Sequence, residues 1–299
     1  MFTVVGSGFG LYGYLPALVD SGERVVLPRA YEAKVRARPE LLRCLAGIEW
    51  ADDADAALSR AGSVVIAAPP RHQIEVAARC AALSHIERIV LEKPVAPTPV
   101  EASRVLAELD RAKKRYRVGY TMLHARWHEN LEWPRATDRA SIVDIDWTFM
   151  AHHFAHGLHN WKRSHEAGGG VLRFFGVHLV ALLARHGYDA VRESSLQGGR
   201  EAEPERWQAT FAGPGLPECR VRVDSRRETE RFEIAHTQEG ARRALVALRD
   251  PFGQERPGAG DDPRVGILQR LLATFALDDR AFHALYARTN EIWREVENA

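Results

Sequence analysis

A lysine that follows a short apolar run is the first candidate for chemistry in this sequence. Lys93 stands in the tripeptide Glu92-Lys93-Pro94, directly after Ile89-Val90-Leu91. Such a run predicts a buried strand, and in open α/β sheets ligands bind outside the carboxyl ends of the strands. A partly buried lysine at that place can have its pKa lowered towards neutrality, so it can carry a proton. The alternative is a lysine that only ends a strand or pairs with Glu92.

A glycine-rich turn close to the N-terminus is the second candidate. The turn Gly6-Ser7-Gly8-Phe9-Gly10 separates an expected strand, residues 2–5, from an expected helix, residues 11–21. A turn without Cβ atoms lets backbone N–H groups and a helix N-terminus approach a pyrophosphate. The third glycine of the usual fingerprint is replaced by Leu11, and Gly10 stands one place earlier. An ordinary strand-to-helix turn is the alternative, but the position at the start of an alternating α/β region favours nucleotide binding.

The residues after the second expected strand bear on which dinucleotide binds. In NAD enzymes an acid near this point usually binds the ribose 2′-hydroxyl. Here the strand ends Val26-Leu27-Pro28-Arg29, and Arg29 is available to meet a 2′-phosphate. The sequence therefore favours NADP as the cofactor. NAD is the alternative, because Glu32 is a nearby acid. A surface arginine is the structural alternative.

Strands and helices alternate through the first 120 residues, and this alternation predicts a parallel sheet with helices on both faces. The expected strands are residues 2–5, 24–27, 48–50, 64–68, 88–91 and 116–119, and the expected helices are residues 11–21, 33–45, 54–60, 73–83 and 99–113.

The pattern changes after about residue 120, which indicates a second domain of a different type. Residues 141–147 and 220–223 alternate apolar and polar side chains, as half-exposed antiparallel strands do. Residues 176–185 predict a helix, and residues 250–263, rich in Gly, Pro and Asp, predict a loop before one or two closing helices. We expect one domain over residues 1–120 and another over residues 121–299.

The composition limits the kinds of partner. The 299 residues include 41 basic and 40 acidic side chains, for a net charge of +1, so the sequence gives no sign of the broad basic surface that draws in nucleic acid or an anionic membrane. Cys44, Cys80 and Cys219 fit neither a disulfide framework nor a paired-cysteine zinc site. The sequence contains no basic leader and no uninterrupted apolar stretch of about 18 residues. We expect a cytoplasmic protein whose partner is a small molecule.

Five motifs follow one another in order along most of the chain. They are Gly6-Ser7-Gly8-Phe9-Gly10 with Leu15-Pro16-Ala17-Leu18, Ile66-Ala67-Ala68-Pro69-Pro70 with His72, Glu92-Lys93-Pro94, Val118-Gly119-Tyr120, and Gly168-Gly169-Gly170 ahead of His178. This series resembles the glucose-fructose oxidoreductase, inositol dehydrogenase and rhizopine-catabolism (Gfo/Idh/MocA) family. The resemblance implies a Rossmann domain with a doubly wound parallel sheet, followed by an α/β domain with a large, mainly antiparallel open sheet that often forms homodimers or homotetramers. It also implies NAD(P)-dependent oxidation or reduction of a sugar, cyclitol or related carbonyl.

The resemblance also implies roles for individual residues. The family lysine that matches Lys93 lies beside the nicotinamide and the reacting oxygen of the substrate. The histidine that matches His178 shares the acid/base work, and imidazole suits that work because it titrates near physiological pH. The implied cofactor contacts are Gly6, Gly8, Phe9, Gly10, Ala68, Pro69, Pro70, His72, Glu92 and Lys93.

One part of this sequence departs from the family pattern. The usual acid four residues before the histidine is Phe174, and Ala181 stands where a second acid is often found. A phenyl ring can neither accept a proton nor orient a hydroxyl. The pocket is therefore more apolar, which suits a carbonyl or imine substrate, an aromatic group, or a reaction that needs only Lys93 and His178. Phe174 also motivates the alternatives of a nucleotide-binding protein without redox function and of non-redox acid/base chemistry.

The segment 151–165 is dense in histidine, which is one signature of metal binding. Only Glu166 supplies a carboxylate close by and no cysteine is near, so we expect no metal. We expect instead that this stretch forms part of the substrate pocket or its rim. The candidates to bind hydroxyls or a phosphate there are His156, His159, Trp161, Lys162 and Arg163.

Four further aromatic residues have less specific interpretations. Tyr120 either touches substrate or packs between the domains. Trp127, Trp133 and Trp147 are expected in the core rather than as ligand platforms.

Overall fold

The computed structural model describes residues 1–136, 141–198, 202–253 and 260–299, and the chain forms two compact units. The first unit comprises Met1–Ala96, Arg104–His124 and Glu255–Phe282. The second unit comprises Pro97–Ser103, Ala125–Gln254 and His283–Ala299. Each unit contains one six-stranded sheet.

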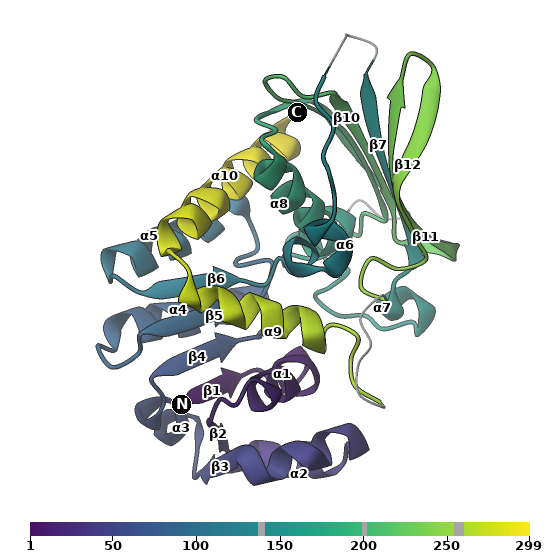
Figure 1. The fold of residues 1–299 in the computed structure, drawn as a ribbon. Coiled ribbons are helices and arrows are strands. Elements are labelled where there is room, and N and C mark those ends of the chain that lie inside the picture. Colours follow the sequence, from purple (N-terminus) through teal and green to yellow (C-terminus); the bar gives the residue numbers. More distant parts are fainter. Residues whose placement is uncertain (137–140, 199–201, 254–259) are drawn as a thin grey trace. The chain divides into compact units, whose positions relative to one another are not determined.

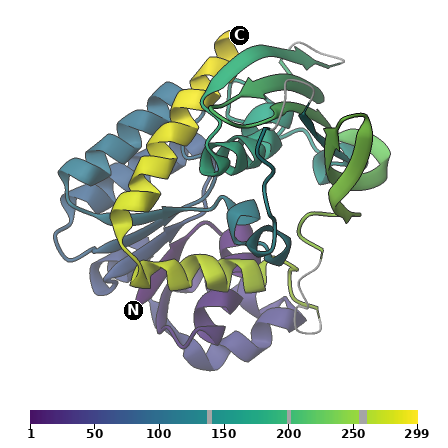
Figure 2. The ribbon, with the colours of Figure 1, turned by 45° about the horizontal axis from the view of Figure 1, so that its top comes forward.

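The sheet of the first unit is entirely parallel, with strand order β3-β2-β1-β4-β5-β6 and helices on both faces (Figures 1 and 2). The order reverses between β1 and β4, and the crevice at such a reversal is where α/β proteins bind ligands. The doubly wound parallel sheet predicted from the alternation is therefore confirmed. Its strands are β1 (Phe2–Val5), β2 (Val25–Pro28), β3 (Ile48–Ala51), β4 (Ser63–Ile66), β5 (Arg88–Leu91) and β6 (Arg115–Val118).

Two helices of this region differ from the prediction. The helix expected over residues 11–21 begins as a π-helix, Gly10–Tyr14, before α1 (Leu15–Asp20). The helix expected over residues 33–45 is two elements, α2 (Glu32–Arg36) and a 3₁₀-helix, Pro39–Gly47. A proline has no N–H and its ring clashes with the preceding turn, so residue 39 does not continue α2. The other helices are α3 (Ala54–Arg60), α4 (Pro70–Ala82) and α5 (Pro99–Arg111).

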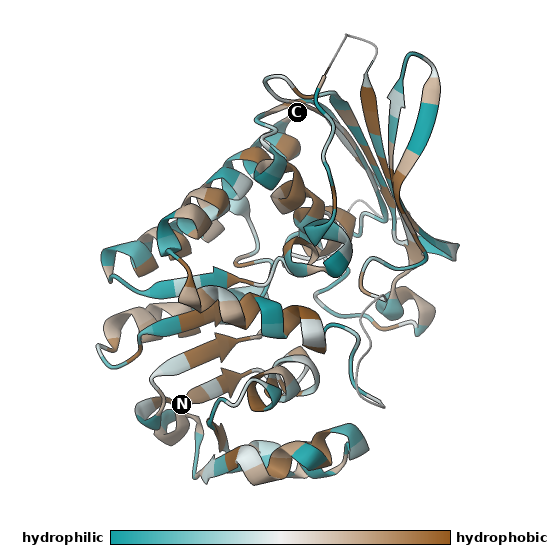
Figure 3. Ribbon diagram, in the orientation of Figure 1, coloured by the Kyte–Doolittle hydropathy of each residue, from teal (hydrophilic) through white to brown (hydrophobic). Residues whose placement is uncertain are grey.

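The core of the first unit includes a helix from far along the chain. In α9 (Val265–Ala273), Leu268 and Leu271 are fully buried and belong to one apolar cluster with Leu15 and Leu18 of α1. Figure 3 shows apolar residues along the strands of this sheet and in α9. An amphipathic helix is stabilised mainly by burying its apolar face, so α9 is an integral layer of this unit.

The sheet of the second unit is mixed, with strand order β12-β11-β7-β10-β9-β8. Residues 141–147 and 220–223 were both expected in antiparallel strands, but they lie in β7 and β10, which are parallel to each other and antiparallel to their outer neighbours. The direction was not predictable, because alternation with a period of two is the same for both kinds of pairing. The strands are β7 (Ile142–Met150), β8 (Ala190–Gln197), β9 (Arg206–Ala212), β10 (Glu218–Asp224), β11 (Arg226–Gln238) and β12 (Ala241–Leu248).

One face of this sheet is covered by α8 (Val177–His186), whose first eight residues are all buried (Figure 1). Just before α8, a Cβ on Gly176 would lie 2.7 Å from the Trp207 ring of β9, so the helix start packs closely on the sheet. The other helices of the second unit are α6 (Arg126–Glu129), α7 (His152–Ala155) and most of α10 (Asp279–Asn298). In the described part of the chain no helix is both long and apolar enough to cross a membrane.

Candidate cofactor and substrate site

The glycine turn combines two tightly packed positions with one open position. Gly6 has φ +121°, and a Cβ there would overlap the carbonyl oxygen of Ala67, just after β4. A Cβ on Gly10 would lie 2.7 Å from Val4 Cγ1. By contrast, Gly8 is exposed and has nothing within 4 Å of the place a Cβ would take. The turn is held against the sheet at both ends and leaves room for a ligand in the middle.

Phe9 connects this turn to the C-terminal segment of the first unit. Its ring lies 5.4 Å from the ring of Tyr12 and 5.4 Å from the ring of Tyr14. The guanidinium carbon of Arg264 lies 4.0 Å from the Phe9 ring centroid, and Arg264 also pairs with Asp262 at 2.8 Å. Sequence reasoning missed Arg264, because nothing in the spacing of the residues links position 264 to position 9.

The residues after β2 bring a different cation to the turn from the one expected. Arg29 is largely exposed, and its Nη1 lies 3.5 Å from Glu32 Oε2. Glu32 also accepts hydrogen bonds from Arg36, the shorter at 2.7 Å. Lys34 Nζ donates to Ser7 Oγ in the glycine turn at 2.7 Å. Lys34 and Ser7 were not singled out from the sequence, although a lysine shortly after the second strand is a usable signal.

The residues after β4 lie at the same edge as the glycine turn, since β1 and β4 are parallel neighbours. Ala68 is half-buried and Pro69 exposed, and α4 begins at Pro70. His72 is exposed in the first turn of α4, with Nδ1 3.1 Å from Glu75 Oε2. Of this group, Ala68 and Pro69 are the residues closest along the chain to the carboxyl end of the strand.

A buried glutamine holds the backbone around Lys93. Gln73 is fully buried in α4, and its Nε2 donates to the carbonyl oxygens of Glu92 (2.7 Å), Pro94 (3.0 Å) and Val95 (3.0 Å). Its Oε1 accepts from the backbone N–H of Glu92 at 3.0 Å. The Lys93-Pro94 peptide bond is cis. Gln73 therefore fixes the backbone that carries Lys93, a role that its sequence position did not reveal.

The Glu92 side chain joins this turn to the start of the first helix. Tyr14 donates its hydroxyl to Glu92 Oε1 at 2.6 Å, and a Cβ on Gly119 would lie 2.5 Å from that same oxygen. Burial raises the pKa of Glu92, and the charge of Lys93 and the Tyr14 hydrogen bond oppose that rise only in part. The ends of β1, β4 and β5 thus meet at one edge, which brings the glycine turn, Gln73 and Lys93 together.

In the second unit, Phe174 and His178 lie on one continuous helical segment. A π-helix, Val171–Gly176, precedes α8, so the helix begins earlier than the predicted residue 176. Phe174 is half-buried, whereas His178 is only 3% exposed. The His178 ring lies 5.7 Å from that of Phe252, a loop residue that sequence reasoning did not single out.

The expected pocket residues 161–163 divide into two kinds. The Trp161 ring meets the Phe174 ring edge-on at 5.4 Å, and Lys162 Nζ lies 5.4 Å from the centre of the same ring. Arg163 is buried instead, donating to the carbonyl oxygen of His153 at 2.7 Å. Trp161 and Lys162 are thus gathered at Phe174, while Arg163 supports the backbone.

The histidines of this stretch do not form one cluster. His156 and His159 are exposed, and the His156 ring lies 4.1 Å from that of His152. His153 is buried, and burial together with the charge of Arg163 lowers its pKa to about 4. Within the described residues, no group of three or more His, Cys, Asp or Glu side chains is placed to hold a metal ion.

The remaining aromatic candidates are mostly covered. Tyr120 is 1% exposed in the first unit. Trp127 and Trp147 are buried in the second unit, as expected for core residues. Trp133 is half-buried and stacks on His186 with ring centres 4.1 Å apart.

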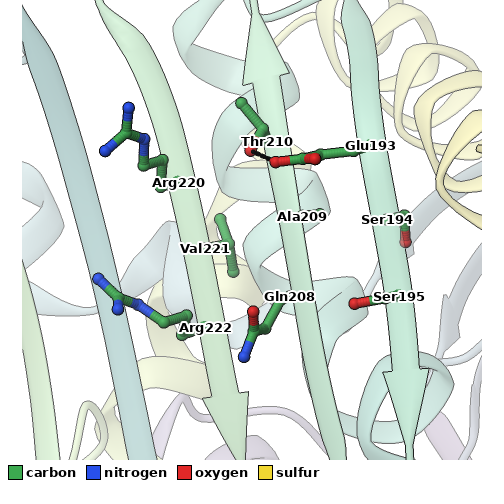
Figure 4. A pocket seen from close by; sticks show the side chains of 9 residues that line it. All are labelled: Glu193, Ser194, Ser195, Gln208, Ala209, Thr210, Arg220, Val221 and Arg222. Carbon is green, nitrogen blue, oxygen red and sulfur yellow. Dashed lines mark hydrogen bonds between the residues drawn. The ribbon is translucent and has the colours of Figure 1, made fainter.

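A separate hollow lies on the sheet of the second unit, over β8, β9 and β10 (Figure 4). Arg220 and Arg222 are exposed while Val221 and Val223 are buried, so this hollow is on the solvent-facing side of β10. None of the residues predicted for the site lines it. The lining residues are Glu193, Ser194, Ser195, Gln208, Ala209, Thr210, Arg220, Val221 and Arg222.

Comparison with solved structures shows the same fold over the whole chain. The WlbA dehydrogenase from Chromobacterium violaceum, solved with NADH and UDP-GlcNAcA, is 16% identical with a TM-score of 0.72, covering 99% of this chain and 93% of that one. The 3-ketoreductase KijD10 from Actinomadura kijaniata, solved with NADP, is 13% identical with a TM-score of 0.69, covering 99% and 95%. A myo-inositol dehydrogenase from Corynebacterium glutamicum is 13% identical with a TM-score of 0.67, covering 99% and 95%.

Comparison by sequence identifies the N-terminal part. No curated protein matches the sequence. The profile of the oxidoreductase family with an NAD-binding Rossmann fold, Gfo/Idh/MocA, matches residues 1–120, which hold the glycine turn and Lys93. By this match, residues 1–120 are an NAD-binding Rossmann domain of the Gfo/Idh/MocA oxidoreductase family, and the whole chain has the fold of the solved enzymes named above.

Proposed function

We propose that the protein oxidises or reduces a sugar, a sugar derivative or a related carbonyl or imine, with Lys93 and His178 handling the proton. The glycine turn and the residues after β4 would hold the nicotinamide cofactor, which would supply or take up the hydride at the substrate carbon. When a carbonyl is reduced, its oxygen needs one proton, which the Lys93 ammonium gives; in oxidation, the neutral amine takes the proton back. Residues 1–120 would bind the cofactor, and residues 121–299 would bind the substrate and form the oligomer contact.

The observation that supports this proposal most directly is the hydrogen bonding of Gln73 to the backbone around Lys93. Its four hydrogen bonds fix the lysine at the sheet edge where the glycine turn also lies. A proton carrier is effective only when it is held within hydrogen-bond reach of the reacting oxygen. A lysine that merely ended a strand would need no such support.

The sugar part of the proposal rests on the structural relatives. The WlbA dehydrogenases were solved with UDP-GlcNAcA, and KijD10 is a 3-ketoreductase solved with a TDP derivative. A nucleotide-linked or otherwise derivatised sugar is consistent with the absence of a carboxylate at Phe174. His178 would share the proton with Lys93 at the substrate oxygen.

For the cofactor, we favour NADP over NAD. Relatives were solved with NADH and with NADP, so the fold admits both. In this chain Lys34 bonds to Ser7 within the glycine turn, and Arg29 and Arg36 stand on the same stretch with Glu32 as their shared partner. A 2′-phosphate adds negative charge near the end of the second strand, where these cations would bind it.

We also propose that the protein is a cytoplasmic homodimer or homotetramer that associates through the open face of the second sheet. That face carries positive and negative side chains on neighbouring strands. Arg222 Nε lies 3.1 Å from Asp146 Oδ1, and Arg222 Nη2 lies 3.6 Å from Asp144 Oδ1. Such a face can pair with a copy of itself about a two-fold axis. Sedimentation equilibrium checks this, and a monomer at all concentrations would rule it out.

Two measurements test the function. The first is a fluorescence titration with NADPH and with NADH. The second follows absorbance of the reduced cofactor with a panel of keto-sugars and imines, for the native protein and for Lys93→Met. We expect the variant to lose about 10²–10⁴-fold in turnover, the usual range for a positioned acid/base group, while NADPH affinity changes little. Full activity of Lys93→Met would eliminate the role given to Lys93.

Phe174 favours a second candidate function, that of a nucleotide-binding protein that has lost redox function or that performs non-redox acid/base chemistry. In the redox-inactive case, the cofactor binds but no carbonyl compound is reduced. In the non-redox case, product forms without a lasting change in cofactor absorbance. Hydride exchange with any substrate of the panel decides against both.

A further inference from the structure

A connected set of half-buried rings lies around Phe174 in the second unit. Phe174 is 4.7 Å from Phe175 and 5.4 Å from Trp161, and Phe175 is 4.7 Å from Phe149. Phe149 and Phe252 both contact the buried Trp147, at 4.6 and 6.2 Å. We call this set the aromatic platform; its half-buried members are Phe149, Trp161, Phe174, Phe175 and Phe252.

The platform differs from the other exposed apolar groups of the chain. Among the described residues, large hydrophobic side chains with greater exposure are aliphatic and widely separated in sequence: Leu42, Val100, Leu158, Leu196 and Leu277. Scattered single residues of that kind need no explanation, whereas contiguous aromatic surface marks a binding site. The rings of the core proper, such as Trp207 and Phe211, are fully buried.

The glycine run that precedes the π-helix holds Trp161 and Lys162 against Phe174. A Cβ on Gly169 would overlap the backbone of Trp161 and Lys162, so only glycine permits this close approach. The Gly170 N–H also donates to the Lys162 carbonyl oxygen at 2.8 Å. The glycine run therefore allows the close packing that positions two residues, Trp161 and Lys162, at Phe174.

The other side of the platform is fixed as firmly. Arg173, next to Phe174, makes a two-fold hydrogen bond to Glu297 of α10, at 2.6 and 2.8 Å, and donates to the His165 carbonyl oxygen at 2.9 Å. Both residues of the Arg173–Glu297 pair are mostly buried, so the pair is strong and geometrically specific. A rigid support of this kind is what a recognition surface requires.

The platform also borders a histidine and a lysine. His178 contacts Phe252 at 5.7 Å, and Lys162 Nζ lies 5.4 Å from the Phe174 ring centre. Because the lysine ammonium lies over the Phe174 ring, a ligand ring that packed on Phe174 would lie near a positive charge. A phenyl group offers no hydrogen bond to a vicinal diol, so bare sugar hydroxyls gain nothing at this position.

We propose that the substrate carries a flat aromatic group that packs on Phe174 and Trp161. This deepens the proposed function and rests on it. Aromatic contacts, together with the apolar area that they bury, favour an aryl-bearing ligand by about tenfold. The aromatic group is either an aglycone or the base of a nucleotide sugar.

Calorimetric binding in the presence of NADP tests the proposal with two matched pairs of probes. The first pair is 4-nitrophenyl β-D-glucoside and methyl β-D-glucoside, and the second is dTDP and inorganic pyrophosphate. We expect the aromatic member of at least one pair to bind about tenfold more tightly. Preference in the first pair alone points to an aglycone, and preference in the second points to a base. Equal affinities within both pairs, or no binding of any probe, would overturn the proposal.

Variants of the platform test whether its rings cause the tighter binding of the aromatic probe. Phe174→Leu keeps most of the apolar volume but removes the ring, so the preference within the responding pair should fall about fivefold while the non-aromatic probe is unaffected. Phe282→Leu is the control, because Phe282 is a half-buried ring in the first unit that also carries a guanidinium, that of Arg117 at 4.0 Å. Should Phe174→Leu fail to fold, Trp161→Leu tests the same preference. An unchanged preference in a folded variant would contradict the assignment.

The proposal and the proposed function can fail separately. If the protein reduces keto-sugars but shows no preference for aromatic probes, the redox function stands and the platform is not a substrate surface. If NADPH and NADH both fail to bind to folded protein, the redox function itself falls.

Discussion

The glycine turn at residues 6–10 and the glycine run at residues 168–170 have similar compositions but different surroundings. In the turn, Gly6 and Gly10 pack on the sheet, and Gly8 is left open. In the run, all three residues are buried, and Gly169 packs on the backbone of Trp161 and Lys162. The glycine turn leaves room for a ligand beside its backbone, whereas the glycine run lets the segment with Trp161 and Lys162 approach closely. Glycine content alone therefore does not indicate whether a segment binds a ligand itself or positions another segment that binds the ligand.

The same contrast holds for the two candidate sites as wholes. In the first unit, the residues that form the site are held by backbone contacts, such as those of Gln73 with Glu92, Pro94 and Val95. In the second unit, the site residues are rings that touch one another. Backbone geometry is shared by any protein with this turn, so it suits a common cofactor; side-chain rings are easily exchanged, so they suit an individual substrate.

The largest effect on stability should come from alanine at the packed glycines. Gly6→Ala and Gly169→Ala both force a Cβ into backbone, so each should destabilise the fold by more than about 3 kcal/mol. Gly8→Ala should leave the unfolding free energy within about 1 kcal/mol of native, because its Cβ meets open space, yet weaken NADPH binding at least about tenfold. Denaturant titration and NADPH titration check this. Equal stability of Gly6→Ala and Gly8→Ala would show that close packing at Gly6 does not limit the residue at that position.

A smaller effect is expected from removing the support of Lys93. Gln73→Leu leaves three carbonyl groups and one N–H without this partner, which should cost about 2–4 kcal/mol of stability and lower kcat. NADPH affinity should change less than kcat, because the glycine turn is intact. Glu75→Gln, on an exposed face of the same helix, is the control and should alter neither quantity. A native kcat in folded Gln73→Leu would show that the turn needs no support.

A smaller change in cofactor affinity should distinguish Lys34 from Arg36, the two cations of α2. Lys34→Ala should raise the Kd for NADPH about tenfold and leave that for NADH within about twofold, since only NADPH carries the 2′-phosphate. Arg36→Ala removes a cation from the same short helix that bonds to Glu32 rather than to the turn, and should have the smaller effect. Equal losses for both cofactors in Lys34→Ala would place the lysine elsewhere than at the 2′-phosphate.

The smallest effect is a dependence of stability on pH in the second unit. The pKa of His153 is lowered to about 4 in the folded chain, so the unfolded chain, with a histidine pKa near 6.5, binds the proton more readily. Stability should therefore fall as the pH drops from about 6.5 to about 4, by about 1–2 kcal/mol at pH 5, and level off below. His153→Phe should flatten this part of the curve of Tm against pH. A parallel curve for the variant would assign the acid sensitivity to other groups.

Much of the first unit was predictable because its signals are local. Short apolar runs, Asp53 before α3 and the glycine turn after β1 each depend on neighbouring residues, and the structure has the predicted strands within a residue or two at most ends. The helix over residues 33–45 was wrongly predicted as continuous, although the proline at position 39 was a signal against it.

Three features follow from the periodicity of the residues and their order in the chain: the alternating α/β elements, the parallel first sheet and the place of Lys93 after β5. Three others could be read only from the folded chain: β7 and β10 are parallel, Arg264 lies on Phe9, and Gln73 holds the turn of Lys93. The same is true of the platform around Phe174, whose rings come from four separate segments. Such contacts join residues far apart in the chain, and their formation depends on how whole elements pack, which no local pattern of residues specifies.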